Sequence, residues 1–263
     1  MLGIAVWNTK CGKDNYYMDD YLIKLYHYNS MHSKETLSIN VPNEQAHINK
    51  KKVEYINAIT LGDTHDVKYR IEGNVTDTFI HRRTSWNFEN ELDIEQLFKI
   101  LINSFGGIED WNGDRPFRKR TYPSGGALYA IRPYILINNV NGLEGNTLYY
   151  FDGDTNQLQL INNNIDASKM YRYTSLTYSH IKSYDQASVY VFFTANLTET
   201  IPKYGLLSYR LALLETGHMS ENLMLCCSAL SLASVPFGGI FEAKLNEYLM
   251  IGDDTVLYFY AIG

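Results

Sequence analysis

Two arginines and a threonine stand together at residues 82–84, ahead of a segment with helical periodicity. The guanidinium groups of Arg82 and Arg83 can each donate a fork of hydrogen bonds to phosphate oxygens, and the Thr84 hydroxyl adds another donor. For the triplet taken alone, a solvated pair of arginines is the more common outcome. The triplet is therefore a candidate phosphate site that needs support from other parts of the chain.

A glycine-containing segment follows a turn-rich region, at Pro123, Ser124, Gly125 and Gly126. Because glycine lacks a Cβ atom, the backbone N–H groups of such a segment can approach a flat ligand closely. An ordinary turn between a loop and a helix is the alternative. The segment has neither the G-x-G-x-x-G spacing of a dinucleotide fold nor the G-K-[ST] ending of a P-loop, which excludes both of those sites.

A lysine and a tyrosine are adjacent at Lys203-Tyr204, after Pro202 and a strand-like run. Free lysine and tyrosine side chains titrate near about 10.4 and 10, so neither is a good base at neutral pH by itself. An ammonium beside a phenol favours the phenolate, and desolvation favours the neutral amine, so either member of such a pair could become a base. A Lys-Tyr dipeptide without further context is more often structural than catalytic.

Polar residues recur on one face of an otherwise apolar helical stretch, at Glu215, His218 and Asn222. Such a stripe is more often a solvated seam or an internal hydrogen-bond network than a catalytic group. Cys226 and Cys227 lie in the apolar part of the same stretch, where small core residues are expected rather than nucleophiles.

Hydrophobic periodicity predicts the helices that must hold these residues. Asp93 is an N-cap for a helix in which apolar residues recur at helical spacing. The longest helical stretch covers residues 209–234; it is apolar on most sides, so we expect it to be buried, and residues 236–239 end it. A short helix is expected near residues 243–250.

The strands are predicted from runs of β-branched and aromatic residues. Four runs qualify, at residues 134–137, 147–151, 187–194 and 256–262. Residues 1–80 show no dominant period and are interpreted as an N-terminal extension, which leaves residues 81–263 as the main domain.

The composition excludes several classes of protein. With 45% hydrophobic and 14% aromatic residues the chain can bury a substantial core, and a net charge of -6 argues against nucleic acid as the main partner. Three cysteines without a C-x-x-C pair indicate neither a zinc ribbon nor a disulfide framework, and they fit a reducing cytoplasm. No n-region and h-region pattern opens the chain, so we expect no signal peptide. Polar residues and glycines interrupt the most apolar stretch, residues 223–241, so we expect no membrane span.

Taken in order, these motifs resemble the SagB-type azoline dehydrogenases of the nitroreductase superfamily, the oxidases that mature thiazole- and oxazole-containing peptides such as microcins and streptolysin-like toxins. The resemblance covers residues 82–263. Its strongest parts are residues 122–129, 203–205, 209–222 and 236–239. Trp86 and Ala130 depart from the family pattern, since many relatives carry Arg and Pro at these two places.

The resemblance implies an α+β nitroreductase-like fold, with a central, mostly antiparallel sheet flanked by helices, in a swapped homodimer that binds FMN at the subunit interface. In such proteins the residues matching the arginine triplet hold the FMN phosphate and ribityl chain. The glycine segment packs on the isoalloxazine, and the later turn approaches its reactive face. The implied FMN-binding residues are Arg82, Arg83, Thr84, Pro123, Ser124, Gly125, Gly126, Asn222, Pro236, Phe237, Gly238 and Gly239.

The same resemblance makes Lys203 and Tyr204 the catalytic pair and implies a function. The chain is expected to oxidise thiazoline or oxazoline rings to azoles in a ribosomally synthesised precursor peptide, together with a cyclodehydratase. Two alternatives stay open. One is an NAD(P)H-dependent nitro- or quinone reductase, and the other is a flavin-bound scaffold subunit of a peptide-modifying complex.

Overall fold

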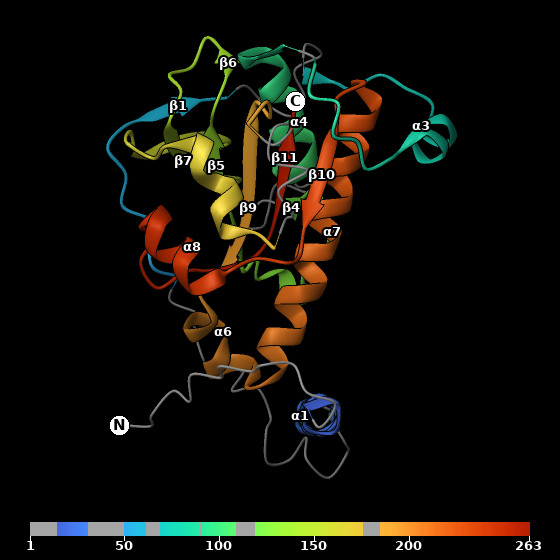
Figure 1. Cartoon of the computed structure of the whole chain (residues 1–263), viewed down its shortest axis with the longest axis vertical. Coiled ribbons are helices and arrows are strands. Elements are labelled where there is room, and N and C mark those ends of the chain that lie inside the picture. The colour runs from blue at the N-terminus through green and yellow to red at the C-terminus, as the bar shows by residue number, and fades with distance from the viewer. Residues whose placement is uncertain (1–14, 31–49, 62–68, 90, 109–118, 176–184) are drawn as a thin grey trace.

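The protein is built around a seven-stranded sheet in which every neighbouring pair of strands is antiparallel. The computed structural model describes residues 15–30, 50–61, 69–89, 91–108, 119–175 and 185–263. The strand order is β1-β8-β7-β5-β9-β11-β10 (Figure 1). The strands are β1 (Ala58–Thr60), β5 (Ile131–Ile137), β7 (Thr147–Asp152), β8 (Gln157–Asn162), β9 (Val189–Ala195), β10 (Ser234–Phe237) and β11 (Thr255–Ile262). This sheet confirms the predicted fold class.

Helices cover both faces of the sheet and give the molecule three layers (Figure 1). The helical elements are α1 (Asn15–Asn29), α3 (Val75–His81), α4 (Ile94–Phe105), η2 (Gly125–Ala127), η3 (Ala167–Tyr173), α6 (Leu197–Tyr204), α7 (Leu207–Ala229) and α8 (Glu242–Leu249). Two small sheets complete the fold: β2 (Leu92–Asp93) pairs with β6 (Val140–Asn141), and β3 (Gly107–Ile108) pairs with β4 (Lys119–Arg120).

The inner strand β9 contributes side chains to both parts of the core. Its seven residues are all buried, as expected for a run of β-branched and aromatic residues covered on both faces. Val191 and Phe193 pack into the cluster that contains residues of α4 and α7. Tyr190 and Phe192 point the other way, into the cluster beneath α8 and η3, because successive strand residues face opposite sides.

The predicted start of α4 is confirmed by its cap. The Asp93 carboxylate accepts a hydrogen bond from the Gln96 N–H, and the Gln96 side chain accepts one from the Asp93 N–H, which together form a capping box. Such a cap satisfies backbone donors that the first helical turn would otherwise leave unpaired. The helix therefore begins at the residue the sequence indicates.

The predicted end of the long helix was wrong. Helix α7 ends at Ala229, Ser231 takes a left-handed φ of 57°, and residues 234–237 form strand β10 instead of continuing the helix. Pro236 fits there because β10 is the edge strand of the sheet, where a residue without an N–H costs no ladder hydrogen bond.

Helix α7 is also less buried than its composition predicts. Leu213 and Leu214 remain 43% and 55% exposed, and Tyr209 is 40% exposed. The opposite face packs on α4 and the sheet. An apolar stripe of α7 is thus left uncovered within the described part of a single chain.

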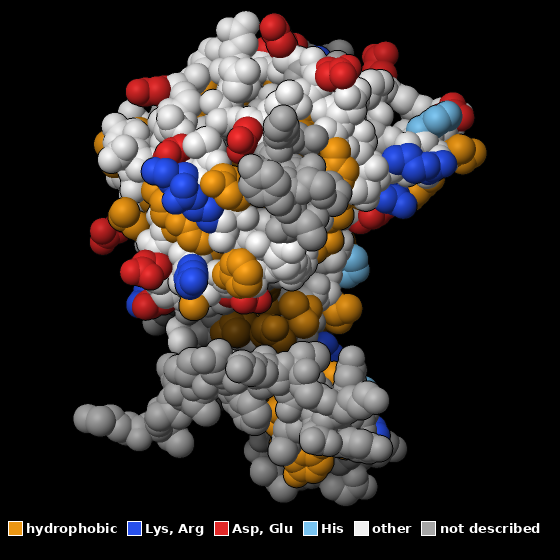
Figure 2. All heavy atoms as spheres, in the orientation of Figure 1, with side chains coloured by type: hydrophobic (Ala, Val, Ile, Leu, Met, Phe, Trp, Pro, Cys, Tyr) orange, Lys and Arg blue, Asp and Glu red, His pale blue; other side chains and the backbone are white. Residues whose placement is uncertain are grey.

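Three elements come from the first 81 residues, so α3 crosses the predicted boundary after residue 80. Strand β1 joins the sheet edge beside β8, and α3 packs against α7. Helix α1 meets the start of α7, where Tyr26 packs edge-on against Tyr209 and Arg210 donates to the His27 carbonyl. Hydrophobic side chains gather on the end of the molecule that faces α1 (Figure 2). Among the described helices, none is long and apolar enough to cross a membrane.

Candidate active site

The Lys203-Tyr204 pair forms the end of helix α6. Asn196 caps the start of this helix by accepting from the Thr198 N–H, and Gly205 ends it with a φ of 53°. The Lys203 ammonium lies over the Tyr204 ring, with Nζ 5.3 Å from the ring centroid. Both side chains are partly exposed, so they can reach a ligand bound beside the helix.

The Tyr204 hydroxyl lies against Gly126 of the predicted flavin-binding segment. A Cβ atom added to Gly126 would lie 2.3 Å from the Tyr204 hydroxyl oxygen, closer than real Cβ atoms approach other heavy atoms. Gly126 also has a φ of 65°, a conformation that glycine adopts without strain. The structure therefore brings Tyr204 of the predicted catalytic pair onto the glycine segment, although the two lie far apart in the sequence.

Glu215 of α7 binds the glycine segment and the start of β5, which follows it. Its carboxylate accepts one hydrogen bond from the Ser124 hydroxyl and one from the Ile131 N–H, the latter at 3.0 Å. Ser124 Oγ in turn accepts from the Tyr129 N–H at 2.8 Å. Burial raises the pKa of the Glu215 carboxyl, and the hydrogen bonds from Ser124 and Ile131 partly offset that effect.

The polar stripe predicted on this helix is divided between two environments. Asn222 is partly buried and its amide donates to the Thr121 carbonyl at 3.1 Å, while His218 is exposed. Glu215 and Asn222 thus belong to internal hydrogen-bond networks, one of the two outcomes expected from the sequence. The two cysteines behave as expected: Cys227 is fully buried, and burial raises the pKa of the Cys226 thiol to about 11.

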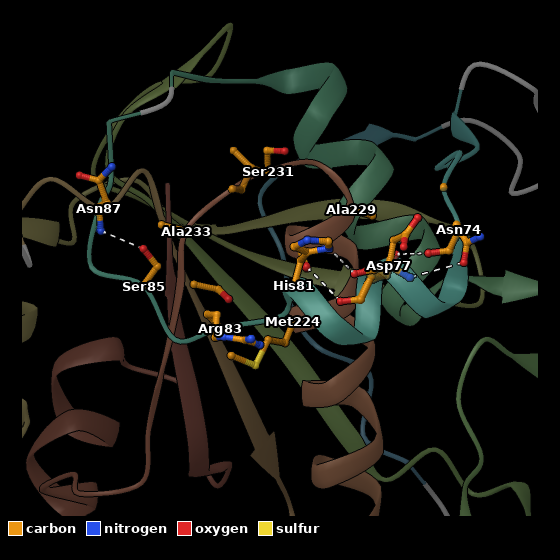
Figure 3. A pocket seen from close by; sticks show the side chains of 15 residues that line it. Asn74, Asp77, His81, Arg83, Ser85, Asn87, Met224, Ala229, Ser231 and Ala233 are labelled. Carbon is orange, nitrogen blue, oxygen red and sulfur yellow. Dashed lines mark hydrogen bonds between the residues drawn. The ribbon is translucent and has the colours of Figure 1, made fainter.

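The arginine triplet lies at the other end of α7, directly after α3. Arg82 Nη1 contacts the Met224 sulfur at 3.1 Å, and Arg82 Nε lies 3.6 Å from a carboxylate oxygen of Glu221. Arg83 points into a cavity of about 510 Å³ between α3, α7 and β10 (Figure 3). The exposed Thr84 follows on the same loop.

The Arg83 cavity is lined mainly by polar groups. The hydroxyl and amide side chains around it belong to Asn74, Thr78, Ser85, Asn87, Ser228, Ser231 and Ser234. Asp77 is the acidic group among them. A guanidinium surrounded by hydroxyl donors fits a phosphate group, whose oxygens accept several hydrogen bonds at once.

Residues 236–239 run beside the loop that carries the arginine triplet. The Ser85 N–H donates to the Ser234 carbonyl at 3.2 Å, and the Trp86 and Phe237 rings meet edge to face with centroids 5.6 Å apart. Pro236 is partly buried, and Gly238 and Gly239 are exposed. The predicted phosphate residues and the predicted turn therefore form one group.

The predicted FMN-binding residues thus form two groups that one chain does not bring together. Glu215 of α7 lies in the group that contains Ser124 and Tyr204. Ser228 of α7 lies in the group that contains Arg83. The helical rise between these two α7 positions places the groups roughly 20 Å apart along the helix axis. Among the described residues, no cluster of three or more His, Cys, Asp or Glu side chains could hold a metal ion.

Comparisons with known proteins agree with this fold. A candidate nitroreductase of Methanocaldococcus jannaschii is 24% identical over 200 residues, 75% of this chain and 96% of that protein. The microcin B17-processing protein McbC of Escherichia coli is 25% identical over 171 residues, which span 64% of this chain and only 60% of McbC.

Solved structures share the same fold. A nitroreductase-type protein of Anabaena variabilis superposes with a TM-score of 0.69 at 23% identity, over 92% of this chain and 47% of that chain. A chain of the E. coli microcin synthetase McbBCD complex with truncated pro-MccB17 bound superposes with a TM-score of 0.60 at 19% identity, over 94% and 91% of the two chains.

The family model described as the nitroreductase family matches residues 82–263, which is more than half of the chain. That match spans the arginine triplet, the glycine segment, the Lys-Tyr pair and strand β11. The chain therefore belongs to the nitroreductase family, whose members are flavin-dependent oxidoreductases that typically bind FMN.

Proposed function

We propose that this chain is an FMN-dependent dehydrogenase that oxidises thiazoline or oxazoline rings in a peptide to the corresponding azoles. The observation that carries the proposal is the contact between the Tyr204 hydroxyl and Gly126. It puts a candidate base on the segment that, by family resemblance, packs against the flavin. The similarity to the microcin B17-processing protein supports a peptide substrate.

Aromatising an azoline ring removes a proton from the ring Cα and a hydride from the neighbouring ring carbon. When bound, FMN supplies the acceptor for the hydride. The chain itself must supply the base on the other side of the substrate ring. Tyr204 would take the proton at its phenolic oxygen, with the Lys203 ammonium beside it over the Tyr204 ring.

The group around Arg83 would hold the phosphate end of FMN. Arg83 lines the cavity together with Ser85 and Ser231. Arg82 and Thr84 do not line it, and they would donate to the phosphate from the adjacent loop. Asn222 and residues 236–239, at the end of β10, would complete the contacts. Pro123, Ser124, Gly125 and Gly126 would pack on the isoalloxazine, where missing Cβ atoms allow close approach.

A homodimer would bring the two groups of predicted FMN-binding residues together at one site. If a second copy adds its Ser124 group to the Arg83 group of the first, each flavin is held by residues from both ends of α7. The exposed apolar stripe of α7, with Tyr209, Leu213 and Leu214, offers surface for such an interface. We propose a swapped dimer on this basis.

The proposed partners are a cyclodehydratase, which forms the azoline ring, and the precursor peptide that carries it. The fold match to a chain of the microcin synthetase complex supports this assembly, as does the similarity to McbC. The net charge of -6 does not favour nucleic acid as a partner. We place the reaction in the cytoplasm, where the precursor peptide is made.

The experiment that tests the proposed function compares two activities of one purified, FMN-loaded sample. The first assay follows the loss of two hydrogens per ring by mass spectrometry on an azoline-containing peptide. The second follows NADH and NADPH oxidation with a nitroaromatic or a quinone. We expect azole formation; nitro or quinone reduction without azole formation would contradict the proposal, and assembly with a cyclodehydratase without either activity would indicate a scaffold.

A further inference from the structure

Glu215 is a buried carboxylate for which the proposed reaction has no direct use. It is 4% exposed, sits on the sheet-facing side of α7, and belongs to neither the arginine triplet nor the Lys-Tyr pair. A buried carboxylate costs free energy unless hydrogen bonds compensate it. Its partners therefore indicate what the residue does.

All hydrogen-bond partners recorded for Glu215 belong to the glycine segment and its continuation. The Ser124 hydroxyl donates to Oε2 and the Ile131 N–H donates to Oε1. The Tyr129 N–H donates to Ser124 Oγ. Each donor in this series of hydrogen bonds meets an acceptor. All of the bonds can therefore form when Glu215 is ionised.

Residues 124–131, which Glu215 binds at both ends, contain unfavourable backbone conformations. Gly126, Ala127 and Tyr129 have φ values of 65°, 54° and 49°, and for residues with a Cβ such values cost free energy. Strained backbone persists only when its surroundings hold it in place. Glu215 binds both ends of residues 124–131 with one side chain, and it thereby helps to maintain this conformation.

The segment in turn limits where the Tyr204 hydroxyl can lie. Gly126 contacts that hydroxyl directly, and Gly125 packs on Leu211, one turn before Glu215 on the same face of α7. A shift of the segment would move the surface on which Tyr204 rests. A displacement of about 1 Å at a reacting group can cost about 10²-fold in rate.

From these contacts we infer that Glu215 is a positioning residue for the proposed dehydrogenase, acting through Ser124 and Gly126 on the Tyr204 hydroxyl. The role in catalysis rests on the proposed function. The structural part does not, because it concerns the backbone of residues 124–131 with or without substrate.

The test uses Ser124→Ala and Glu215→Gln in the full-length, FMN-loaded protein, with Glu247→Gln as the matched control on an exposed position of α8. Amide hydrogen exchange at single-residue resolution is the readout independent of activity. Ser124→Ala should lower the protection of the Tyr129 amide roughly tenfold to a hundredfold and leave the Ile131 amide protected. Glu215→Gln replaces one acceptor oxygen by a donor, so protection should fall at Tyr129, Ile131 or both.

Kinetics on the azoline peptide form the second arm. Both variants should lower kcat by about 10²-fold per bound FMN while KM stays close to the wild-type value, with FMN content measured on the same samples. Their combination should lose little more than either variant alone, because both act on one chain of hydrogen bonds. Glu247→Gln should behave as wild type in both arms.

Two results would overturn the inference. One is wild-type protection of the Tyr129 and Ile131 amides in both variants, whatever happens to kcat. The other is a loss of protection with a wild-type kcat, since Glu215 would then hold the segment without positioning Tyr204. If the wild-type protein oxidises no azoline, the proposed function fails, and the exchange arm still decides whether Glu215 holds the segment.

Discussion

Replacing Gly126 by Ala tests whether catalysis depends on the position of the Tyr204 hydroxyl and not only on its presence. The new Cβ would lie 2.3 Å from the hydroxyl oxygen, whereas carbon and oxygen atoms in close contact stay about 3.3 Å apart. The Tyr204 hydroxyl must therefore retreat by roughly 1 Å. The φ of 65° adds a second cost, about 1–2 kcal/mol for a residue with a Cβ.

Because a misplacement of about 1 Å at a reacting group costs about 10²-fold, we expect Gly126→Ala to lower kcat by about that factor. The assay is azole formation on an azoline peptide, followed by mass spectrometry, with FMN content measured on the same sample. Unfolding in urea measures the backbone cost separately.

Gly252→Ala is the matched control. Gly252 has nearly the same φ, 67°, but an added Cβ there would have no atom within 4 Å. This variant should lose about the same stability from backbone strain and keep wild-type kcat. A wild-type kcat in Gly126→Ala, with the protein folded and loaded with FMN, would refute the reasoning that Tyr204 must sit on Gly126 to work.

Three further predictions concern the cofactor, a buried carboxyl and the assembly. Replacing Arg82 and Arg83 by Ala should weaken FMN retention by about 1.5–3 kcal/mol for each lost charge-assisted hydrogen bond, measured by fluorescence of released flavin; unchanged retention would place the phosphate elsewhere. Since burial raises the pKa of Glu215, the unfolded chain releases this proton at lower pH than the folded protein does, so the free energy of unfolding should fall as pH rises above about 4.3. Urea unfolding of wild type and Glu215→Gln should show that fall only in wild type, and parallel curves would contradict it. Light scattering should find a dimer of the FMN-loaded protein, and a monomer with full FMN occupancy would rule out the shared site.

Strands β5, β7, β9 and β11 were predictable because their signal is local, whereas β1, β8 and β10 of the same sheet were not predicted. Residues 189–195 alternate between the two core clusters without a charged residue, and both faces of such a run must be covered. The start of α4 was predictable for a similar reason, since Asp93 and Gln96 form the cap within one turn.

The end of α7 was not predictable from propensity. Residues 230–234 are compatible with a helix, and the chain leaves it because residues 234–237 pair with β11 at the sheet edge. Tertiary pairing here outweighs a weak local preference. The first residue that breaks a helix, Pro236, lies inside the strand that replaces it.

The sequence suggested the members of the site and left their arrangement open. The adjacency of Tyr204 and Gly126 depends on how α6 and α7 pack against residues 124–131, a contact between distant segments. In the sequence Glu215 is a polar residue in an apolar helix, which indicates a buried hydrogen-bond network. The sequence does not identify its partner, Ser124. His218, three residues further on, carries the same sequence signal and is exposed.

The central claim is that Lys203 and Tyr204 form the base unit of an azoline dehydrogenase, and one measurement tests it most directly. Tyr204→Phe and Lys203→Ala are assayed for the loss of two hydrogens per ring on an azoline peptide, alongside the absorption spectrum and content of the bound flavin. General-base loss commonly costs about 10²–10⁴ in rate, so we expect both variants to fall by that range with the flavin spectrum nearly intact. Wild-type turnover in both variants would contradict the claim, and loss of FMN together with activity would show that the pair is structural.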